Sequence, residues 1–216
     1  MSTPAQQLTT TSYAVLGLLC LRDWSAYELV TEMGRGWSDI WPRAVSGIYR
    51  EPKKLVAHGL AKDRAARTGE RSRTVYSVTP EGREAFRTWL ATPTHAPQLE
   101  AEALVRAGFA EHGGVDDLLA TVRQARSFAI ERSRVYAAIG DEYRTEGPRF
   151  PERVHSIMLV GGFLARYFAA IIDWADWVES HAATWDDIGD ADAISDLDAL
   201  RADVRARVEA NLARAR

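Results

Sequence analysis

The chain has 216 residues, of which 46% are hydrophobic and 26% charged, a balance typical of a soluble globular protein with one large or two small domains. Its one cysteine, Cys20, excludes an intrachain disulfide framework and fits a reducing cytoplasm. No signal segment opens the chain, and no apolar run approaches the roughly 20 residues that span a bilayer, so we expect a cytoplasmic protein.

The formal net charge of −3 argues against a nucleic-acid partner, but the charge is unevenly distributed. Residues 1–90 carry 13 basic and 9 acidic side chains, net +4, whereas residues 91–216 carry 14 and 21, net −7. Within residues 43–73 nine basic side chains stand against three acidic ones. This asymmetry predicts a basic, anion-binding module joined to an acidic one.

Three helices are predicted near the start of the chain. Residues 12–21 are apolar at helical spacing, and the next helix begins at Ser25, with Glu28 three residues later as in a capping box. A third helix is expected from about 44–46 to Gly59, a suitable residue just beyond a helix end.

A hairpin and a fourth helix follow. Residues 60–66 are short and extended, residues 68–71 have turn chemistry, and residues 74–78 are β-branched and aromatic. The sequence Thr79-Pro80-Glu81 then predicts a helix start with proline at its first position, continuing to Leu90. The order helix, helix, helix, hairpin, helix predicts a winged helix-turn-helix domain at 12–91 with a two-stranded wing.

The proline-containing segment 92–97 is the predicted domain boundary, and everything beyond it has helical periodicity. We expect a helical dimerisation domain at 98–183, then an acidic loop and an additional C-terminal helix within 184–216. One heptad-like seam is the predicted dimer contact: Ile157, Gly161, Leu164, Phe168, Ile171, Ala175 and Val178. The pair Gly161-Gly162 predicts either a close helix–helix approach in that seam or a local bend.

These segments resemble the PadR family of transcription regulators, in particular its longer-tailed branch with a virulence-activator-like C-terminal region. The match is dense over 12–90 and looser over 98–182. It is carried by AVLGLL at 14–19, YEL at 27–29, SGIYRE at 46–51, LVAHGL at 55–60 and RTVYSVTPEGR at 73–83. Two positions depart from the family pattern: Ala26 stands where glycine is common, and Pro52 falls inside the expected recognition helix, where an apolar residue is usual.

A winged helix places its third helix in the major groove, while the wing contacts the backbone or the minor groove. Arginine offers a bidentate fork to guanine or phosphate, and lysine is mainly a phosphate partner. The predicted DNA contacts are Arg43, Ser46, Tyr49, Arg50, Lys53, Lys54, Arg67, Arg71 and Arg73. One alternative is a solvated basic face in which Arg50 is paired with a neighbouring acid. Another is a winged-helix module that binds protein and no specific DNA.

The expected function is therefore a sequence-specific DNA-binding transcription regulator, a homodimer on a pseudo-palindromic operator. Repressor is the commoner role in the family that the chain resembles. In that wider family, aromatic residues between the domains can line an effector site, which makes Trp89, Trp174 and Trp177 candidates for a ligand pocket; plain core packing is the alternative.

Nothing in the sequence indicates an enzyme. The five histidines are scattered without metal-ligand spacing, and there is no phosphate-binding loop and no nucleophile motif. Asp186, Asp187, Asp190 and Asp192 could attract a divalent cation, although acids near a helix start need no such explanation. We expect no catalysis, no cofactor and no metal.

Overall fold

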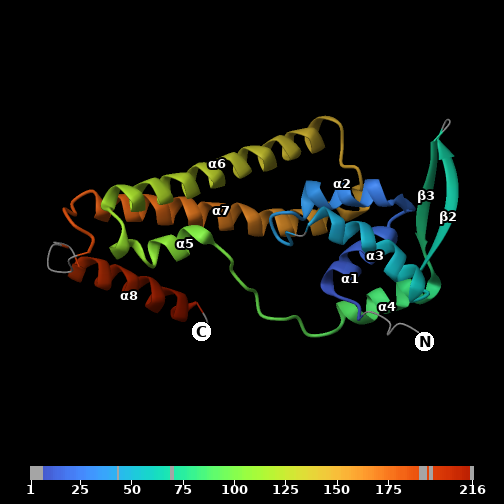
Figure 1. Cartoon of the computed structure of the whole chain (residues 1–216), viewed down its shortest axis with the longest axis horizontal. Helices are drawn as coiled ribbons and strands as arrows, with labels where there is room; N and C mark the ends of the chain where they lie inside the picture. The colour runs from blue at the N-terminus through green and yellow to red at the C-terminus, as the bar shows by residue number, and fades with distance from the viewer. Residues whose placement is uncertain (1–6, 43, 69–70, 190–193, 195–196, 215–216) are drawn as a thin grey trace. The chain divides into compact units, whose positions relative to one another are not determined.

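The computed structural model describes residues 7–42, 44–68, 71–189, 194 and 197–214 (Figure 1). Contacts between residues divide the chain into two compact units, Met1–Pro97 and Gln98–Arg216. The first unit is a winged helix-turn-helix, and the described part of the second contains helices and no strand. The predicted fold class is confirmed.

The first two helices of unit 1 both begin at capping boxes. In a capping box the N-cap side chain accepts a hydrogen bond from the amide three residues later, and the side chain of that residue accepts one from the N-cap amide. Helix α1 spans Thr10–Leu19. Helix α2 spans Ala26–Gly36 and has the predicted capping box: Glu28 Oε2 accepts hydrogen bonds from the amide and the hydroxyl of Ser25, at 2.7 and 2.6 Å.

Helix α3 spans Val45–Ala57 and places Ile48, Pro52 and Leu55 in the core. Pro52 lies about two turns beyond the start, so the helix runs through the proline. Because proline has no N–H, the carbonyl of Ile48 lacks its partner four residues later. The predicted end is confirmed: Gly59 follows the last turn with a φ of 71°, a conformation that favours glycine.

Strands β2 (Ala61–Thr68) and β3 (Arg71–Val78) form the expected antiparallel hairpin, which projects as a long wing in Figure 1. Its register pairs Ala61 with Val78 and Thr68 with Arg71. The sequence did not predict the third strand, β1 (Trp24–Ser25), which pairs with β3 and makes the order β1-β3-β2.

Helix α4 spans Pro80–Leu90, with Thr79 as its cap and proline at its first position, as predicted. Two glycines allow close packing around it. A Cβ on Gly82 would lie 2.0 Å from the Leu60 carbonyl oxygen, and one on Gly17 would lie 2.8 Å from the Phe86 ring. Both glycines therefore serve contacts that an alanine would obstruct.

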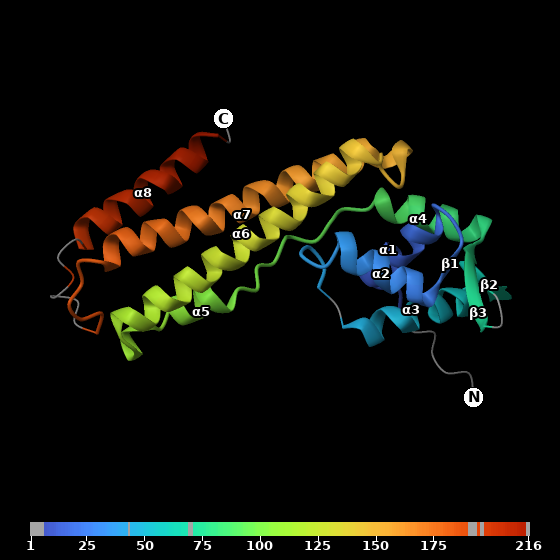
Figure 2. The same ribbon diagram turned by 90° about the horizontal axis from the view of Figure 1, so that it is seen from above.

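The second unit contains helices α5 (Glu102–Ala107), α6 (Val115–Thr145), α7 (Val154–Ala182) and α8 (Leu197–Ala213), with short 3₁₀ turns η1 (Ala110–His112) and η2 (Pro151–Arg153). Helices α6 and α7 pack together where α6 begins and α7 ends, and they diverge toward the loop that joins them (Figure 1), although they overlap in the view of Figure 2. Ion pairs between them reinforce the apolar contact: Arg126 Nη1 lies 2.6 Å from Asp176 and 2.9 Å from Glu179.

Much of the predicted dimer seam on α7 is buried within its own unit. Ala175 and Val178 share a core cluster with residues of α6, and the Phe168 ring lies 6.4 Å from the Phe128 ring and 6.0 Å from that of Tyr136. Leu164 is likewise buried, while Ile157, Gly161 and Ile171 are half-buried. A Cβ added to Gly161 would meet no described atom within 4 Å, so the glycine pair makes no close approach inside the chain at that position.

The stretch Pro151–Ala182 corrects one expectation from the sequence. One of its 18-residue windows has a mean hydropathy of 1.5, so by length and composition this helix could cross a bilayer. The expectation that no segment qualifies is wrong, because Arg166 interrupts the apolar run without lowering the average enough. A single such helix is weak evidence for a membrane span, but only 11% of the window is buried, so the helix has apolar surface to cover.

Candidate nucleic-acid interface

Helix α3 presents an exposed polar face opposite its buried one. Ser46, Tyr49, Arg50 and Lys53 are all exposed, whereas Ile48, Pro52 and Leu55 face the core. The two sets alternate at helical spacing, so the four predicted contacts of this helix lie together on one side. This side combines a guanidinium, an ammonium and two hydroxyls, which suit phosphates and base edges.

Lys54, the fifth candidate on the same helix, turns away from that face. Its side chain is 13% exposed, and its Nζ donates to the Gln7 carbonyl at 2.6 Å and to Ser12 Oγ at 3.3 Å. The carboxylate of Glu51 lies 4.0 Å from the same ammonium. Adjacent lysines of α3 thus have different surroundings, one in solvent and one against α1.

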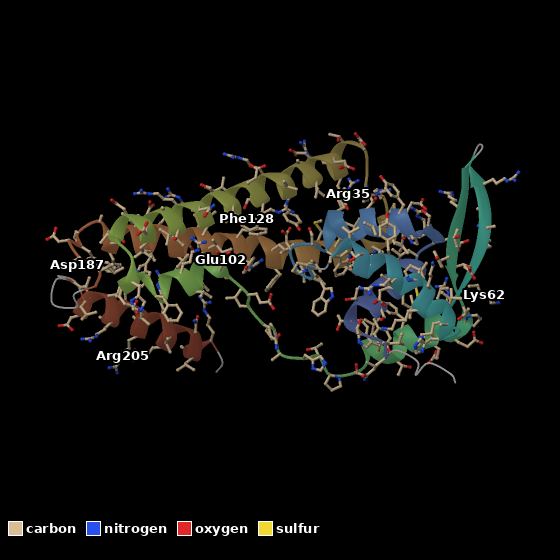
Figure 3. All side chains as sticks on the ribbon, viewed as in Figure 1. Arg35, Lys62, Glu102, Phe128, Asp187 and Arg205 are labelled. Carbon is tan, nitrogen blue, oxygen red and sulfur yellow. The ribbon has the colours of Figure 1, made fainter. Side chains whose placement is uncertain are left out.

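The wing carries the remaining basic candidates. Arg67 and Arg73 are exposed on β2 and β3, and Arg71 opens β3 opposite Thr68. Arg43 and the side chain of Arg71 lie outside the described part of the structure. Lys62 on β2 is a further exposed cation, labelled in Figure 3, that sequence analysis counted in the basic segment without assigning it a contact.

Ion pairs join the wing to α2 and to the segment that precedes it. Arg64 Nη2 lies 3.2 Å from Asp23, and Arg73 Nη1 lies 3.7 Å from Glu28. Glu28 also accepts a hydrogen bond from Arg22, 3.4 Å away, while it caps α2. Arg73, a predicted DNA contact, therefore also forms an ion pair with Glu28 of α2. The spacing of the two residues in the sequence could not indicate this pair.

The environment of Glu28 favours its charged form. Partial burial raises the pKa of this carboxyl, but the hydrogen bonds from the Ser25 hydroxyl and amide, together with the charge and hydrogen bond of Arg22, outweigh it and hold the pKa below its usual range. The carboxylate is thus the charged centre that holds the helix start and the wing together.

Two aromatic residues near the interface differ in role. Trp24 is buried, and its indole N–H donates to the Leu18 carbonyl at 2.7 Å, so it serves core packing. Tyr27 is 70% exposed on α2, the first helix of the helix-turn-helix.

The three tryptophans of the candidate ligand pocket belong to different units. Trp89 stacks on Tyr13 in unit 1, with ring centroids 4.8 Å apart. Trp174 and Trp177 pack against the core cluster of unit 2, which contains Leu118, Val122, Ala175, Val178 and Ala182. The buried indole N–H of Trp177 has no acceptor among the described residues. Their role in ligand binding stays a prediction.

Metal-binding and nucleophilic groups do not gather in the described part of the chain. No three His, Cys, Asp or Glu residues come together there; Asp190 and Asp192, two of the acids considered for a cation, lie outside it. Burial raises the pKa of the Cys20 thiol, and the nearby charge of Arg83 lowers it by less. A thiol with a raised pKa is a poor nucleophile at neutral pH.

Unit 2 carries an exposed apolar face that sequence analysis did not single out. Met158, Leu159 and Phe163 on α7 are 51%, 77% and 63% exposed, and Phe163 stacks on Tyr167 with centroids 6.3 Å apart. These positions lie beside the predicted seam on the same helix. Single exposed apolar side chains are normal on a protein surface, but a group of large ones on one helix is typical of an interaction surface.

No protein-family model matches the chain. Over 99 residues it is 28% identical to the negative transcriptional regulator PadR of Bacillus subtilis (strain 168), a match covering 45% of this chain and 54% of that protein. The matched segment therefore spans about half the length of this curated relative.

Solved structures of PadR-like regulators have the same fold. Bacillus subtilis PadR in complex with operator DNA superimposes with a TM-score of 0.66 at 20% identity, over 81% of this chain and 98% of that one. The same protein with p-coumaric acid gives 0.65 at 18% identity, over 81% and 99%. The Vibrio cholerae virulence activator AphA gives 0.59 at 21% identity, over 79% and 96%. The resemblance to PadR-like regulators found in the sequence is thus confirmed at the level of the fold.

Proposed function

We propose that this protein is a sequence-specific DNA-binding transcription regulator that acts as a homodimer. The observation that carries the proposal is the exposed face of α3, where Ser46, Tyr49, Arg50 and Lys53 stand together on the helix that a winged helix-turn-helix inserts into the major groove. A neighbour with this fold was solved with operator DNA. We place Arg43, Arg67, Arg71 and Arg73 beside these four as contacts to the phosphate backbone.

The charge distribution supports the same function. The basic segment 43–73 contains α3, β2 and the start of β3, and the acidic surplus lies beyond residue 90. A dimer would present the basic segment twice, on two half-sites of a pseudo-palindromic operator. Because a single winged helix contacts few base pairs, two copies supply the specificity that a regulator needs.

We assign the dimer contact to α7, on the side that carries Met158, Leu159 and Phe163. These side chains are exposed in the single chain, whereas Leu164 and Phe168 of the predicted seam already pack inside it. A second copy would also cover the apolar surface of a helix that its own unit leaves mostly open.

Regulation would follow from a change in the separation of the two copies of α3. Repression is the proposed outcome, since the curated relative is a negative regulator. A small aromatic effector is the proposed signal, supported by the neighbour solved with p-coumaric acid. The protein would act in the cytoplasm, without catalysis.

A DNA-binding titration tests the proposal. Duplexes enriched by the protein from a randomised pool should contain an inverted repeat, and the logarithm of affinity should fall linearly and steeply with the logarithm of salt concentration. Arg50→Ala should weaken binding at least about tenfold, as expected for loss of a base or phosphate contact. Arg87→Ala, which removes an exposed arginine from α4, is the matched control and should bind nearly as wild type.

No enrichment and no retardation at low salt would contradict the DNA-binding proposal. That outcome would favour the alternative, a winged-helix module for protein contacts, which has no need of the exposed cations on α3. If Arg50→Ala and Arg87→Ala reduced the affinity for DNA equally, binding would depend on the net positive charge alone. The α3 face would then have no specific role in DNA binding.

A further inference from the structure

We propose that Lys54 and Glu51 are positioning residues that, through Ser12, fix the rotation of α3 about its own axis and so determine which side chains contact DNA bases. The inference rests on the proposed function and adds to it a source of specificity that does not contact DNA. It also assigns different roles to two neighbouring lysines: Lys53 contacts DNA, whereas Lys54 positions the helix.

The contacts that carry this inference form one small network between α3 and the start of α1. Ser12 Oγ donates to Glu51 Oε2 at 2.6 Å, a short, charge-assisted hydrogen bond. Lys54 Nζ donates to the Gln7 carbonyl and to Ser12 Oγ, at 2.6 and 3.3 Å. Ser12 itself is fully buried and holds the Thr9 amide as part of the α1 capping box.

Both charged side chains of the network are largely withdrawn from water. The exposed fractions are 13% for Lys54 and 14% for Glu51, although both belong to the helix that carries the candidate DNA face. A lysine free to contact phosphate would lie in solvent, as Lys53 does. Lys54 is instead bonded to a backbone carbonyl 47 residues away in the sequence.

Such a network contributes more to geometry than to stability. Removing two charges from water is costly, and a buried ion pair often stabilises a fold no better than apolar residues would. Hydrogen bonds have direction, however, whereas apolar contacts such as those of Ile48 and Leu55 tolerate small rotations. Helix α3 also has no side-chain hydrogen bond at its N-cap, Ala44, so its start does not fix its rotation.

The position of Lys54 on the helix connects the network to the DNA face. Lys54 lies one turn after Arg50, and residues four apart are neighbours on a helix surface. A rotation that carried Lys54 away from α1 would therefore move Arg50 by the same angle. The Ser12–Glu51–Lys54 network holds that angle at the value at which Ser46, Tyr49, Arg50 and Lys53 face outward.

Two adjacent substitutions distinguish this role from a phosphate contact. Lys54→Met and Lys53→Met each remove one positive charge from α3 and keep most of the apolar stem. Affinity is measured for the enriched duplex and for an unrelated duplex of the same length, each across a series of salt concentrations. Thermal unfolding of every variant is recorded, so that a loss of folded protein is not taken for a loss of binding.

For Lys54→Met we expect the operator affinity to fall about tenfold while the affinity for unrelated DNA and the salt slope stay at the wild-type values. For Lys53→Met we expect the slope to fall by about 0.9 for each subunit on both duplexes, since a phosphate contact releases counterions. Its preference for the operator should change little, because phosphate contacts carry no sequence information.

A salt slope that falls in Lys54→Met as it does in Lys53→Met would overturn the inference and make Lys54 an ordinary phosphate contact. Where Lys54→Met unfolds, Glu51→Gln replaces it: this change keeps an oxygen acceptor for Ser12 and removes the charge that faces Lys54. A Glu51→Gln variant whose operator preference stays within twofold of wild type would also overturn the inference. A wild-type protein with no operator preference would contradict the proposed function itself, an outcome visible before any variant is compared.

Discussion

The exposed face of α7 gives a prediction that separates a dimer contact from an internal core. Leu159 and Phe163 are 77% and 63% exposed, whereas Leu164, on the same helix, is 2% exposed. Changing both exposed residues to aspartate should abolish the dimer and leave each subunit folded. Changing Leu164 to aspartate should unfold unit 2 instead, because it places a charge in an apolar core without a partner.

The expected magnitude follows from the surface still open on each side chain. Full burial of a leucine or phenylalanine contributes about 1.5–3 kcal/mol, so covering the exposed parts of Leu159 and Phe163 contributes about 2–4 kcal/mol for each subunit. Both copies together give about 4–8 kcal/mol, and each 1.4 kcal/mol changes an equilibrium constant tenfold, so the double variant should weaken the dimer by about three to six orders of magnitude.

Sedimentation equilibrium at micromolar concentration measures the association, and circular dichroism with heating reports whether each variant is folded. Wild type should sediment as a dimer, and the Leu159→Asp, Phe163→Asp variant as a folded monomer. Specific DNA binding should weaken together with the dimer, although no residue of α3 is altered. A wild-type monomer, or a double variant that stays dimeric, would refute the reasoning and move the search to α8.

Three further predictions concern the first unit. Pro52→Leu should raise the free energy of unfolding by about 1 kcal/mol, because relieving an interior proline is worth about 3 kcal/mol and fitting a longer side chain costs roughly 1–3 kcal/mol; a lower midpoint in urea would show that packing dominates. Glu28→Gln should lower stability at pH 7 by about 1 kcal/mol. Since the folded-state pKa of Glu28 is lowered, its contribution is present above the unfolded value of about 4.3 and is lost as the pH falls through the folded value. Wild type and variant should therefore converge in urea titrations as the pH is lowered through that range, and a constant difference would contradict this. Gly82→Ala should destabilise by roughly 1–3 kcal/mol, since its Cβ would meet a backbone oxygen, whereas Gly34→Ala, with nothing within 4 Å, should stabilise by about 0.5–1 kcal/mol; melting temperatures that shift in the same direction would count against the packing argument.

The order of elements in the first unit could be predicted because its signals are local. The capping box at Ser25, the glycine after α3 and the Thr79-Pro80 helix start each act within four residues, and the structure has all three. The strand β1 was not predictable in the same way. Two residues, Trp24 and Ser25, carry too little pattern, and their extended conformation depends on pairing with β3, some 50 residues later in the chain.

The candidate DNA contacts likewise divide into those that the sequence predicted and those whose surroundings depend on the tertiary structure. The polar residues Ser46, Tyr49, Arg50 and Lys53 of the predicted third helix were selected as DNA contacts by their chemistry, and all four are exposed. Lys54 was selected with them, although it is bound to Gln7 and Ser12. A charge pattern reports where cations are dense, whereas the partner of each cation depends on which other element packs beside it.

The apolar period of α7 is the clearest instance of what sequence and tertiary structure each determine. The sequence alone predicted an apolar seam from Ile157 to Val178 within a helical region, because side-chain chemistry and the helical period are local properties. Only the tertiary structure decided which part of that surface is already covered. Helix α6 packs against Phe168, Ala175 and Val178 and leaves Leu159 and Phe163 open, since burial depends on which elements meet in space and not on the spacing within one helix.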